Sequence, residues 1–297
     1  MNTTPTKSVF FLSDYGIRDE FVGVVHAVLA KTAPGVPVID LTHRVPPFDV
    51  RAGANTLVRA IPHLGPGVVL AVVDPGVGSG RRGLCLEVPS LRGGPAWFVG
   101  PDNGLLVAAA ELAGGGQITR AFELHHGNGP DGGGATFDGR DLFAPAAAAL
   151  AKGTAPDTLG QPIGVDALIR LLPGVVEYGR LPDGRRCLRT EVTWVDHFGN
   201  IQLAVTSPDA AAAGFPSTGS VELTVLTGSG ESAHPTLPTA LVPDGVLLRC
   251  VRTFADLESG ALGLLIDAND HLALVAGQAS AAHWLNVMAG ELMLLVW

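Results

Sequence analysis

The chain is poor in positive charge. Its 19 lysine and arginine residues stand against 28 aspartate and glutamate residues, which gives a net charge of -9. This balance is unsuited to a phosphate backbone, so we do not expect a nucleic-acid partner. No apolar run approaches the roughly 18 residues that cross a bilayer, and the first seven residues lack the apolar core of a signal peptide. We therefore expect a cytoplasmic protein with no membrane segment.

Cysteine is scarce as well, and the usual cofactor fingerprints are missing. The three cysteines, Cys85, Cys187 and Cys250, are far apart and in no ligand spacing, which is typical of reduced structural thiols. The first predicted strand is followed by Tyr-Gly-Ile-Arg-Asp at 15–19 instead of G-x-G-x-x-G, which argues against NAD and FAD. The glycine-rich turn at 76–80 lacks the Gly-Lys-Ser/Thr of a phosphate loop. We expect neither a metal nor a cofactor.

The length of 297 residues favours two domains. Over residues 1–175, short apolar runs alternate with helical patterns, which predicts an α/β domain with a mostly parallel sheet. The predicted strands are 9–14, 36–41, 68–73, 84–88 and 96–99, and the predicted helices are 19–31, 52–61, 103–112 and 141–152. Residues 114–134 are rich in glycine, histidine and asparagine, and we expect them to form a loop or lid.

The pattern changes after about residue 175. Residues 186–297 contain short apolar runs joined by turns, with hardly any helical pattern between them, which predicts a smaller all-β barrel domain. The predicted strands are 189–195, 201–205, 221–226, 247–251, 262–266 and 272–275, and the proline-rich stretch 235–243 is expected to be a loop.

Residues 67–81 give the clearest sign of a functional site. An apolar run typical of a buried parallel strand ends at Asp74, and a glycine-rich turn then leads to Arg81. Ligands of open α/β sheets bind at the carboxyl ends of the strands. The other explanation of the same residues is an ordinary turn with a solvated ion pair between Asp74 and Arg81.

Three other polar clusters lie at the ends of predicted elements, and each has two explanations. Asp14 ends the first strand and could accept hydrogen bonds from a ribose diol, or cap the next helix. Asp196 and Asn200 flank an aromatic residue, where they could bind an amine and a base edge, or form a hairpin turn. Asp138 lies before a helix and is either a site group or a cap.

Taken together, six motifs resemble the S-adenosyl-L-methionine (SAM) hydroxide adenosyltransferase family, the hydrolytic relatives of the fluorinase and the chlorinase. They are Phe-Leu-Ser-Asp at 11–14, Asp-Pro-Gly-Val-Gly at 74–78, Gly-Pro-Asp-Asn-Gly-Leu-Leu at 100–106, Thr-Phe and Gly-Arg-Asp within 136–141, Asp-His-Phe-Gly-Asn at 196–200 and Thr-Phe-Ala-Asp at 253–256. The resemblance implies a homotrimer in which the carboxyl-terminal β-barrel domain completes the site on a neighbouring subunit. It also implies hydrolysis of SAM at C5′ to adenosine and L-methionine, with SAM as substrate and no cofactor.

The resemblance also implies roles for single residues. Asp74 would orient or deprotonate the attacking water, and Arg81 would keep Asp74 ionised. The implied substrate contacts are Asp14 with the ribose, Asp19 and Asp196 with the methionine ammonium, Asn200 with the adenine edge, and Phe198 and Phe254 with the adenine faces, while Phe48 stands where the halogenases carry a tryptophan.

One departure from the family bears on catalysis. The family has a histidine where this chain has Asp138, so we expect a pair of acids bridged by Arg81, with slower hydrolysis. A protein that binds adenosine or SAM without turnover is the alternative. A halogenase is disfavoured, because Asp74 and Asp138 would both repel a halide. The halogenases also place an arginine near the substrate carboxylate, where this chain has Ala268-Asn269.

Overall fold

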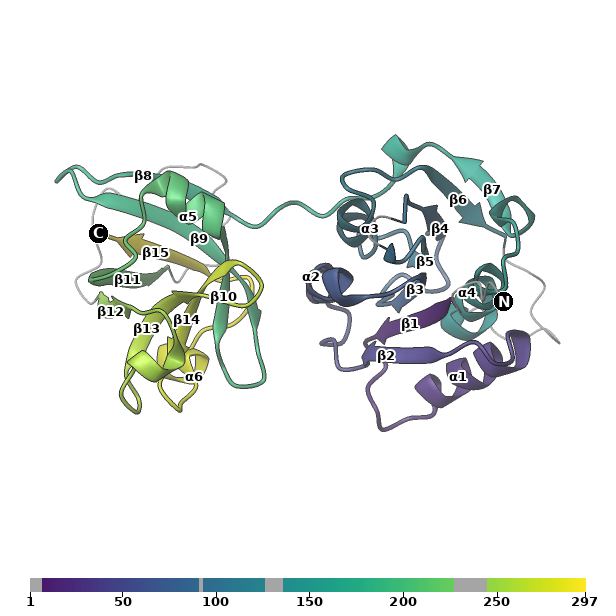
Figure 1. Cartoon of the computed structure of the whole chain (residues 1–297), viewed down its shortest axis with the longest axis horizontal. Helices are drawn as coiled ribbons and strands as arrows, with labels where there is room; N and C mark the ends of the chain where they lie inside the picture. Colours follow the sequence, from purple (N-terminus) through teal and green to yellow (C-terminus); the bar gives the residue numbers. More distant parts are fainter. Residues whose placement is uncertain (1–6, 91–92, 126–135, 227–244) are drawn as a thin grey trace. The chain divides into compact units, whose positions relative to one another are not determined.

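The structure is a computed structural model with two compact units, Met1–Leu171 and Leu172–Trp297 (Figure 1). The residues described are 7–90, 93–125, 136–226 and 245–297.

The amino-terminal unit is built around a seven-stranded sheet with the order β2-β1-β3-β5-β4-β6-β7. Its strands are β1 (Ser8–Ser13), β2 (Val38–Thr42), β3 (Gly67–Val72), β4 (Gly83–Glu87), β5 (Trp97–Pro101), β6 (Arg120–Leu124) and β7 (Gly160–Ile163). β2, β1, β3 and β5 are parallel, whereas β4, β6 and β7 are antiparallel to their neighbours. The connection from β4 to β5 is too short for a parallel crossover, which explains where the antiparallel part begins.

Helices cover both faces of this sheet, as Figure 1 shows. The helices are α1 (Phe21–Thr32), α2 (Val50–Ala60), α3 (Val107–Ala113) and α4 (Ala144–Ala151). Along β1, Phe10 and Leu12 pack towards α2 and α3, while Val9 and Phe11 pack towards α1 and α4. Burial on both faces accounts for the continuous apolar runs of the sequence. The α/β class predicted from the sequence is confirmed.

The parallel part of the sheet positions the candidate site. β1 and β3 are neighbours in register, with Ser13 opposite Val72. The next residues of both strands therefore emerge at the same edge of the sheet. This edge receives Asp14 from β1 and Asp74 from β3.

One prediction for this unit is wrong in part. Residues 114–134 were expected to be a loop, but Arg120–Leu124 form β6, which pairs with both β4 and β7. The strand is short and begins with Arg120, whose side chain pairs with Glu87 on β4 at 2.5 Å. Tertiary pairing, not local apolar pattern, makes it a strand. The rest of that prediction, from 126 onwards, lies outside the described residues.

The carboxyl-terminal unit is a closed β-barrel, as predicted. Seven strands pair in the ring β9-β10-β14-β13-β12-β11-β15, and the β9–β15 pairing closes it. The strands of this unit are β8 (Val176–Arg180), β9 (Arg186–Val195), β10 (Ile201–Thr206), β11 (Ser220–Leu226), β12 (Val246–Cys250), β13 (Leu262–Ile266), β14 (His271–Ala276) and β15 (Leu292–Val296), and the helices are α5 (Ser207–Ala213) and α6 (Ala281–Leu285). β8 is added outside the ring along the first half of β9.

Two barrel strands were not predicted. β8 is half-exposed, and β15 is a run of leucine, methionine and valine whose strand character comes from its neighbours β11 and β9. The proline-rich stretch 235–243 lies outside the described residues. Cys85, Cys187 and Cys250 are free thiols, and burial raises the pKa of Cys85 to about 12. No helix in the described part of the chain is both long and apolar enough to traverse a bilayer.

Candidate active site

The turn after β3 folds Arg81 back onto Asp74. Ser79 Oγ donates to the Gly76 carbonyl at 2.6 Å and accepts from the Arg81 backbone N–H at 3.3 Å. Gly78 has φ +78°, a conformation that glycine adopts without strain. The glycine-rich sequence therefore has a local purpose, which is to reverse the chain within a few residues and bring a guanidinium to the end of the strand.

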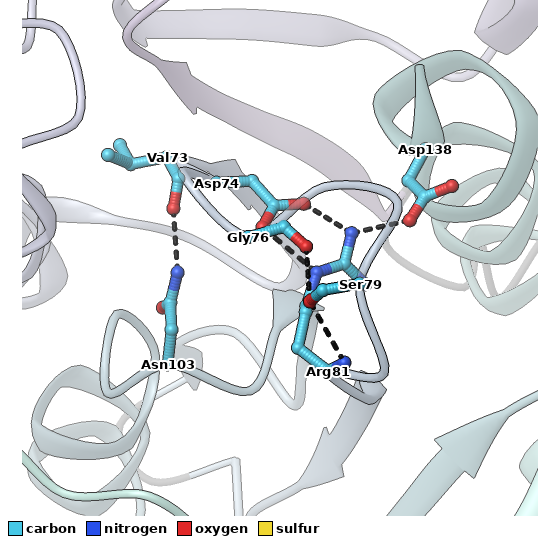
Figure 2. Close-up of polar contacts among 7 residues, drawn as sticks. All are labelled: Val73, Asp74, Gly76, Ser79, Arg81, Asn103 and Asp138. Atoms are coloured by element: carbon cyan, nitrogen blue, oxygen red, sulfur yellow. Dashed lines mark hydrogen bonds and ion pairs between the residues drawn. The ribbon is translucent and has the colours of Figure 1, made fainter. Parts of the chain in front are cut away.

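Arg81 holds two carboxylates with one guanidinium (Figure 2). Its Nε donates to Asp74 Oδ1 at 2.9 Å, and its Nη2 contacts both Asp74 Oδ2 and Asp138 Oδ2. The three side chains are 6% to 10% exposed, so solvent screens these contacts far less than those of a surface pair. The solvated ion pair that the sequence left open is excluded.

Asp138 reaches Arg81 from the other side of the site. It directly precedes a five-residue π-helical turn, Gly139–Phe143, which leads into α4. Gly139 lies against Tyr15, and a Cβ at this position would clash with the tyrosine hydroxyl. The Phe143 ring packs under Arg81, with Cζ 5.1 Å from the ring centroid. Such π turns are frequent at functional sites.

A pocket of about 260 Å³ opens at this edge of the sheet. Its lining includes three carboxylates, those of Asp14, Asp74 and Asp138, and four aromatic rings, those of Tyr15, Phe21, Phe48 and Phe137. Burial raises the pKa of Tyr15, and the neighbouring carboxylates raise it further. The tyrosine is therefore a neutral wall of the pocket. Carboxylates next to aromatic rings suit a cationic ligand with flat and apolar parts.

Asp14 is tied to Phe48. Its Oδ2 accepts the Phe48 backbone N–H at 2.9 Å, while Phe48 has φ +68°, which is unusual for a bulky residue. Backbone strain of this kind is found mainly at functional sites. Burial raises the pKa of Asp14; the Phe48 N–H opposes that change, and nearby Asp74 adds to it. The other oxygen of Asp14 remains for a ligand.

Asn103 is a positioning residue that the sequence analysis missed. Its Nδ2 donates to the carbonyl of Val73 at 2.8 Å (Figure 2), and its Oδ1 accepts the Leu105 N–H at 3.2 Å. Val73 directly precedes Asp74, so Asn103 fixes the backbone from which the Asp74 carboxylate extends. The Pro-Asp-Asn-Gly motif at 101–104 was the available signal.

The structure does not bring Asp19 into this group. Asp19 is exposed just before α1 and does not line the pocket. The sequence-predicted residues that meet here are Asp14, Phe48, Asp74 and Asp138, with Arg81 bonded to two of them.

In the barrel unit, Asp196 and Asn200 form a closed turn. Asp196 Oδ1 accepts the backbone N–H groups of Phe198 and Asn200, both at 2.8 Å, and Oδ2 accepts Asn200 Nδ2 at 2.7 Å. Asp196 and Asn200 therefore form a hairpin turn, which was one of the two explanations of this motif. The turn leaves the Phe198 ring 75% exposed, so its face is open to a ligand.

Two pockets of the barrel unit share Asn200 and Phe254. The larger, of about 520 Å³, also has Phe198 and Ser280 in its lining. The other, of about 360 Å³, is lined by Asp196 and by Arg252 as well. The guanidinium of Arg252 has no ion-pair partner within the described part of the chain. The sequence analysis missed Arg252, although it directly precedes the Thr-Phe-Ala-Asp motif.

Comparison with known proteins gives consistent matches over both units. Residues 9–160 match the SAM hydroxide adenosyltransferase N-terminal domain, and residues 190–293 match the SAM hydroxide adenosyltransferase C-terminal domain. A relative from Salinispora tropica, named (R)-S-adenosyl-L-methionine hydrolase, is 39% identical over 97% of both chains. A fluorinase from Actinoplanes is 27% identical over 95% of both chains. A solved structure of an uncharacterized conserved protein from Thermotoga maritima has a TM-score of 0.79 and 27% identity, covering 97% of this chain and 99% of that one.

Proposed function

The chain belongs to the SAM hydroxide adenosyltransferase family and is a SAM hydrolase that forms adenosine and L-methionine, and we propose that Asp74, Arg81 and Asp138 activate the attacking water. The observation that carries this proposal is the buried guanidinium that holds two carboxylates at the edge of the pocket. The sites assigned below are part of the same proposal.

The reaction needs two things from the protein, which are the placement of water and SAM and one base that takes the proton of the water. A water oxygen attacks C5′ of SAM, the C5′–S bond breaks, and its electron pair stays on sulfur. The leaving group is a neutral thioether, so no general acid is required. The proton of the attacking water passes to Asp74, which must lie in line behind C5′. Desolvation by the aromatic walls of the pocket strengthens these interactions.

Arg81 has two tasks in this proposal. Its contacts with both oxygens of Asp74 fix the orientation of the base. Its Nη1 is buried and has no hydrogen-bond partner among the described residues. A buried donor of this kind loses free energy unless it is satisfied, so we assign it to the attacking water or to the ribose oxygen beside it.

The rest of the substrate is assigned by the chemistry of each group. Asp14 takes the ribose hydroxyls, because a carboxylate accepts two hydrogen bonds at once, and the exposed ring of Phe48 covers the sugar. In the barrel unit, Phe198 and Phe254 take the faces of the adenine, and Asn200 takes its edge.

The amino-acid end of SAM carries one positive and one negative group. Asp196 remains our candidate for the ammonium, with Asp19 as the second. For the carboxylate we assign Arg252, which lines the same pocket as Ala268 and Asn269, where the halogenases place their arginine. An arginine can take a carboxylate through two parallel hydrogen bonds.

We also propose a homotrimer in which the barrel unit of one subunit completes the pocket of the next. The support is the division of the ligand set: base and ribose contacts lie in the amino-terminal unit, and adenine contacts lie in the barrel unit. Neither unit alone provides contacts for all parts of SAM.

The function is tested by incubating the purified full-length chain with SAM in water enriched in ¹⁸O. Hydrolysis at C5′ places the label in the 5′-hydroxyl of adenosine and releases unlabelled L-methionine. Adenosine without the label would overturn attack at C5′. Formation of 5′-chloro-5′-deoxyadenosine as the main product in chloride would make the chain a halogenase, and tight binding of SAM with no product would make it a binding protein.

A further inference from the structure

Three side chains outside the active-site pocket gather at the edge of the amino-terminal sheet. His26 lies on α1, Asp40 lies on β2, and His43 directly follows β2. Asp40 Oδ1 is 2.8 Å from His26 Nε2 and 3.1 Å from His43 Nε2. All three atoms lie within 4.8 Å of one another, and no other group of this kind occurs in the described ranges of the chain.

His43 is held as metal-binding histidines usually are. Its side chain is 6% exposed, and its Nδ1 lies 2.8 Å from Ser13 Oγ. The Phe11 ring packs beside it, with the centroids 4.5 Å apart. A hydrogen bond to one ring nitrogen fixes the orientation of the imidazole and leaves the other nitrogen for a ligand.

The free nitrogen of His43 is not explained by the protein alone. Nε2 is buried and, although Asp40 is within reach, no described residue forms a well-aligned hydrogen bond with it. The bond between His26 and Asp40 accounts for those two side chains, but not for His43. A buried polar atom without a partner calls for a ligand.

Asp40 supplies the carboxylate of the cluster. Its Oδ1 is the atom that both imidazole Nε2 atoms approach. His26 and Asp40 are 35% and 43% exposed, so one side of the cluster is open to solvent. Two imidazoles and a carboxylate, with an open position for water, form a ligand set that suits Zn²⁺.

We propose that His26, Asp40 and His43 bind one divalent transition-metal ion, with Zn²⁺ the preferred ion and water as the fourth ligand. Tetrahedral bonds to Zn²⁺ place ligand atoms about 3.3 Å apart, so His26 and Asp40 need to separate by only about half an ångström. Coordination needs an unprotonated Nε2 on each imidazole, so in a neutral imidazole the ring proton stands on Nδ1 when the ion is bound. The Ser13 hydroxyl both donates and accepts, so it stays bonded to His43 when the imidazole changes tautomer.

The ion would fasten α1 and β2 to the strand that carries a substrate-binding residue. Ser13 is fully buried and directly precedes Asp14. The carbonyl of His43 also accepts the N–H of Gly16 at 2.7 Å. The site is separate from the pocket, and the proposal does not rest on the proposed function.

The test uses the full chain, without a histidine tag and dialysed against a chelator. Calorimetric titration with ZnCl₂ should give one equivalent per chain. Titration with Co²⁺ should give the intense visible bands of a tetrahedral site. His26→Asn and Asp40→Asn should each weaken binding at least tenfold, whereas His63→Asn, at an exposed histidine elsewhere, should not.

Two results would overturn the proposal. One is the absence of stoichiometric binding of either ion to the parent protein. The other is unchanged binding in both His26→Asn and Asp40→Asn, with circular dichroism showing that the variants are folded. Because the readouts are stoichiometry and spectra, failure of this proposal leaves the SAM hydrolase assignment unaffected.

Discussion

Arg81 and Asp138 are 57 positions apart in the sequence, yet the Arg81 guanidinium donates to the Asp138 carboxylate at the edge of the pocket. The same nitrogen, Nη2, also contacts Asp74. One cation thus holds two acids, and each acid competes for it. The first two predictions separate the roles of the two acids.

Asp74→Asn should keep SAM binding and lose turnover. The amide retains the shape of the carboxylate but cannot take a proton, so kcat should fall by about 10²- to 10⁴-fold with a small change in KM. Steady-state kinetics of adenosine formation measure this. The matched control is Asp102→Asn, which breaks the neighbouring buried pair with Arg82 and should lower thermal stability while preserving kcat. An unchanged rate in Asp74→Asn would make Asp74 a turn residue only.

Asp138→His should speed the reaction. The substitution removes one of the two acids that share Arg81 and introduces the family's imidazole, so kcat should rise by about 10- to 100-fold, the lower end of what a positioned acid–base group contributes. Asp138→Asn is the control, because it removes the charge without adding an imidazole. A slower Asp138→His enzyme would mean that Asp138 has its own part in the mechanism, and an unchanged rate would place residue 138 outside the chemistry.

The sequence predicted most of the fold because its elements carry strong local patterns. β1 and β3 are apolar on both faces and an aspartate follows each within two residues, so both strands and the edge where they meet could be inferred. β6 and β15 could not, because their strand character comes from the neighbours that they pair with. The antiparallel pairing of β4 with β5 could be inferred only from the short connection between them, which cannot hold a parallel crossover.

Site residues that directly follow a strand or a turn could be predicted from the sequence. Site residues that are placed by tertiary contacts could not. Asp14, Asp74 and Arg81 stand next to regular elements, so their positions follow from the topology. Asn103 and Arg252 lie in or beside motifs that the sequence displays, but their places beside a backbone carbonyl and in a pocket wall follow only from the tertiary structure. The closed turn of Asp196 likewise depends on hydrogen bonds that sequence spacing permits but does not require.

Asp14→Asn should weaken substrate binding without destabilising the fold at neutral pH. Burial raises the pKa of Asp14 above its usual 3.8, so the stability that this group contributes is present at low pH and is lost as pH rises through the raised pKa. The amide avoids that loss and still accepts the Phe48 N–H. Differential scanning calorimetry should therefore show a Tm equal to or above that of the parent at pH 7.5, with any gain smaller at pH 4.

The same variant should raise KM, since its amide oxygen stays with the Phe48 N–H and an NH2 group replaces the carboxylate oxygen that faces the ribose diol. Asp49→Asn is the matched control, because Asp49 caps α2 through Ala52 and does not line the pocket. A loss of stability in Asp14→Asn that is greater at pH 7.5 than at pH 4 would show that the ionised carboxylate stabilises the fold.

Arg252→Gln should lower kcat/KM for SAM by about tenfold, which corresponds to the loss of one charged hydrogen-bond pair of about 1.4 kcal/mol. The effect should lie in KM, because the carboxylate of SAM is far from the reacting bond.

Decarboxylated SAM provides the sharper test of the role of Arg252. The parent should prefer SAM over this analogue, and the variant should have lost that preference. Arg249→Gln, at an exposed arginine that does not line the pocket, is the control and should retain it.

The proposed sharing of each site between two subunits predicts complementation between two inactive variants. Asp74→Asn disables the amino-terminal unit and Phe254→Ala disables the barrel unit, so each homotrimer should have little activity. If each site takes its two halves from different subunits, an equal, randomly assembled mixture forms about one quarter of its sites from two intact halves. Co-expression of the two variants should therefore restore about a quarter of the parent activity per site. Sedimentation should give the mass of three chains of 30.5 kDa each. Mixtures that stay as inactive as the separate variants, or a fully active monomer, would show that each chain builds its site alone.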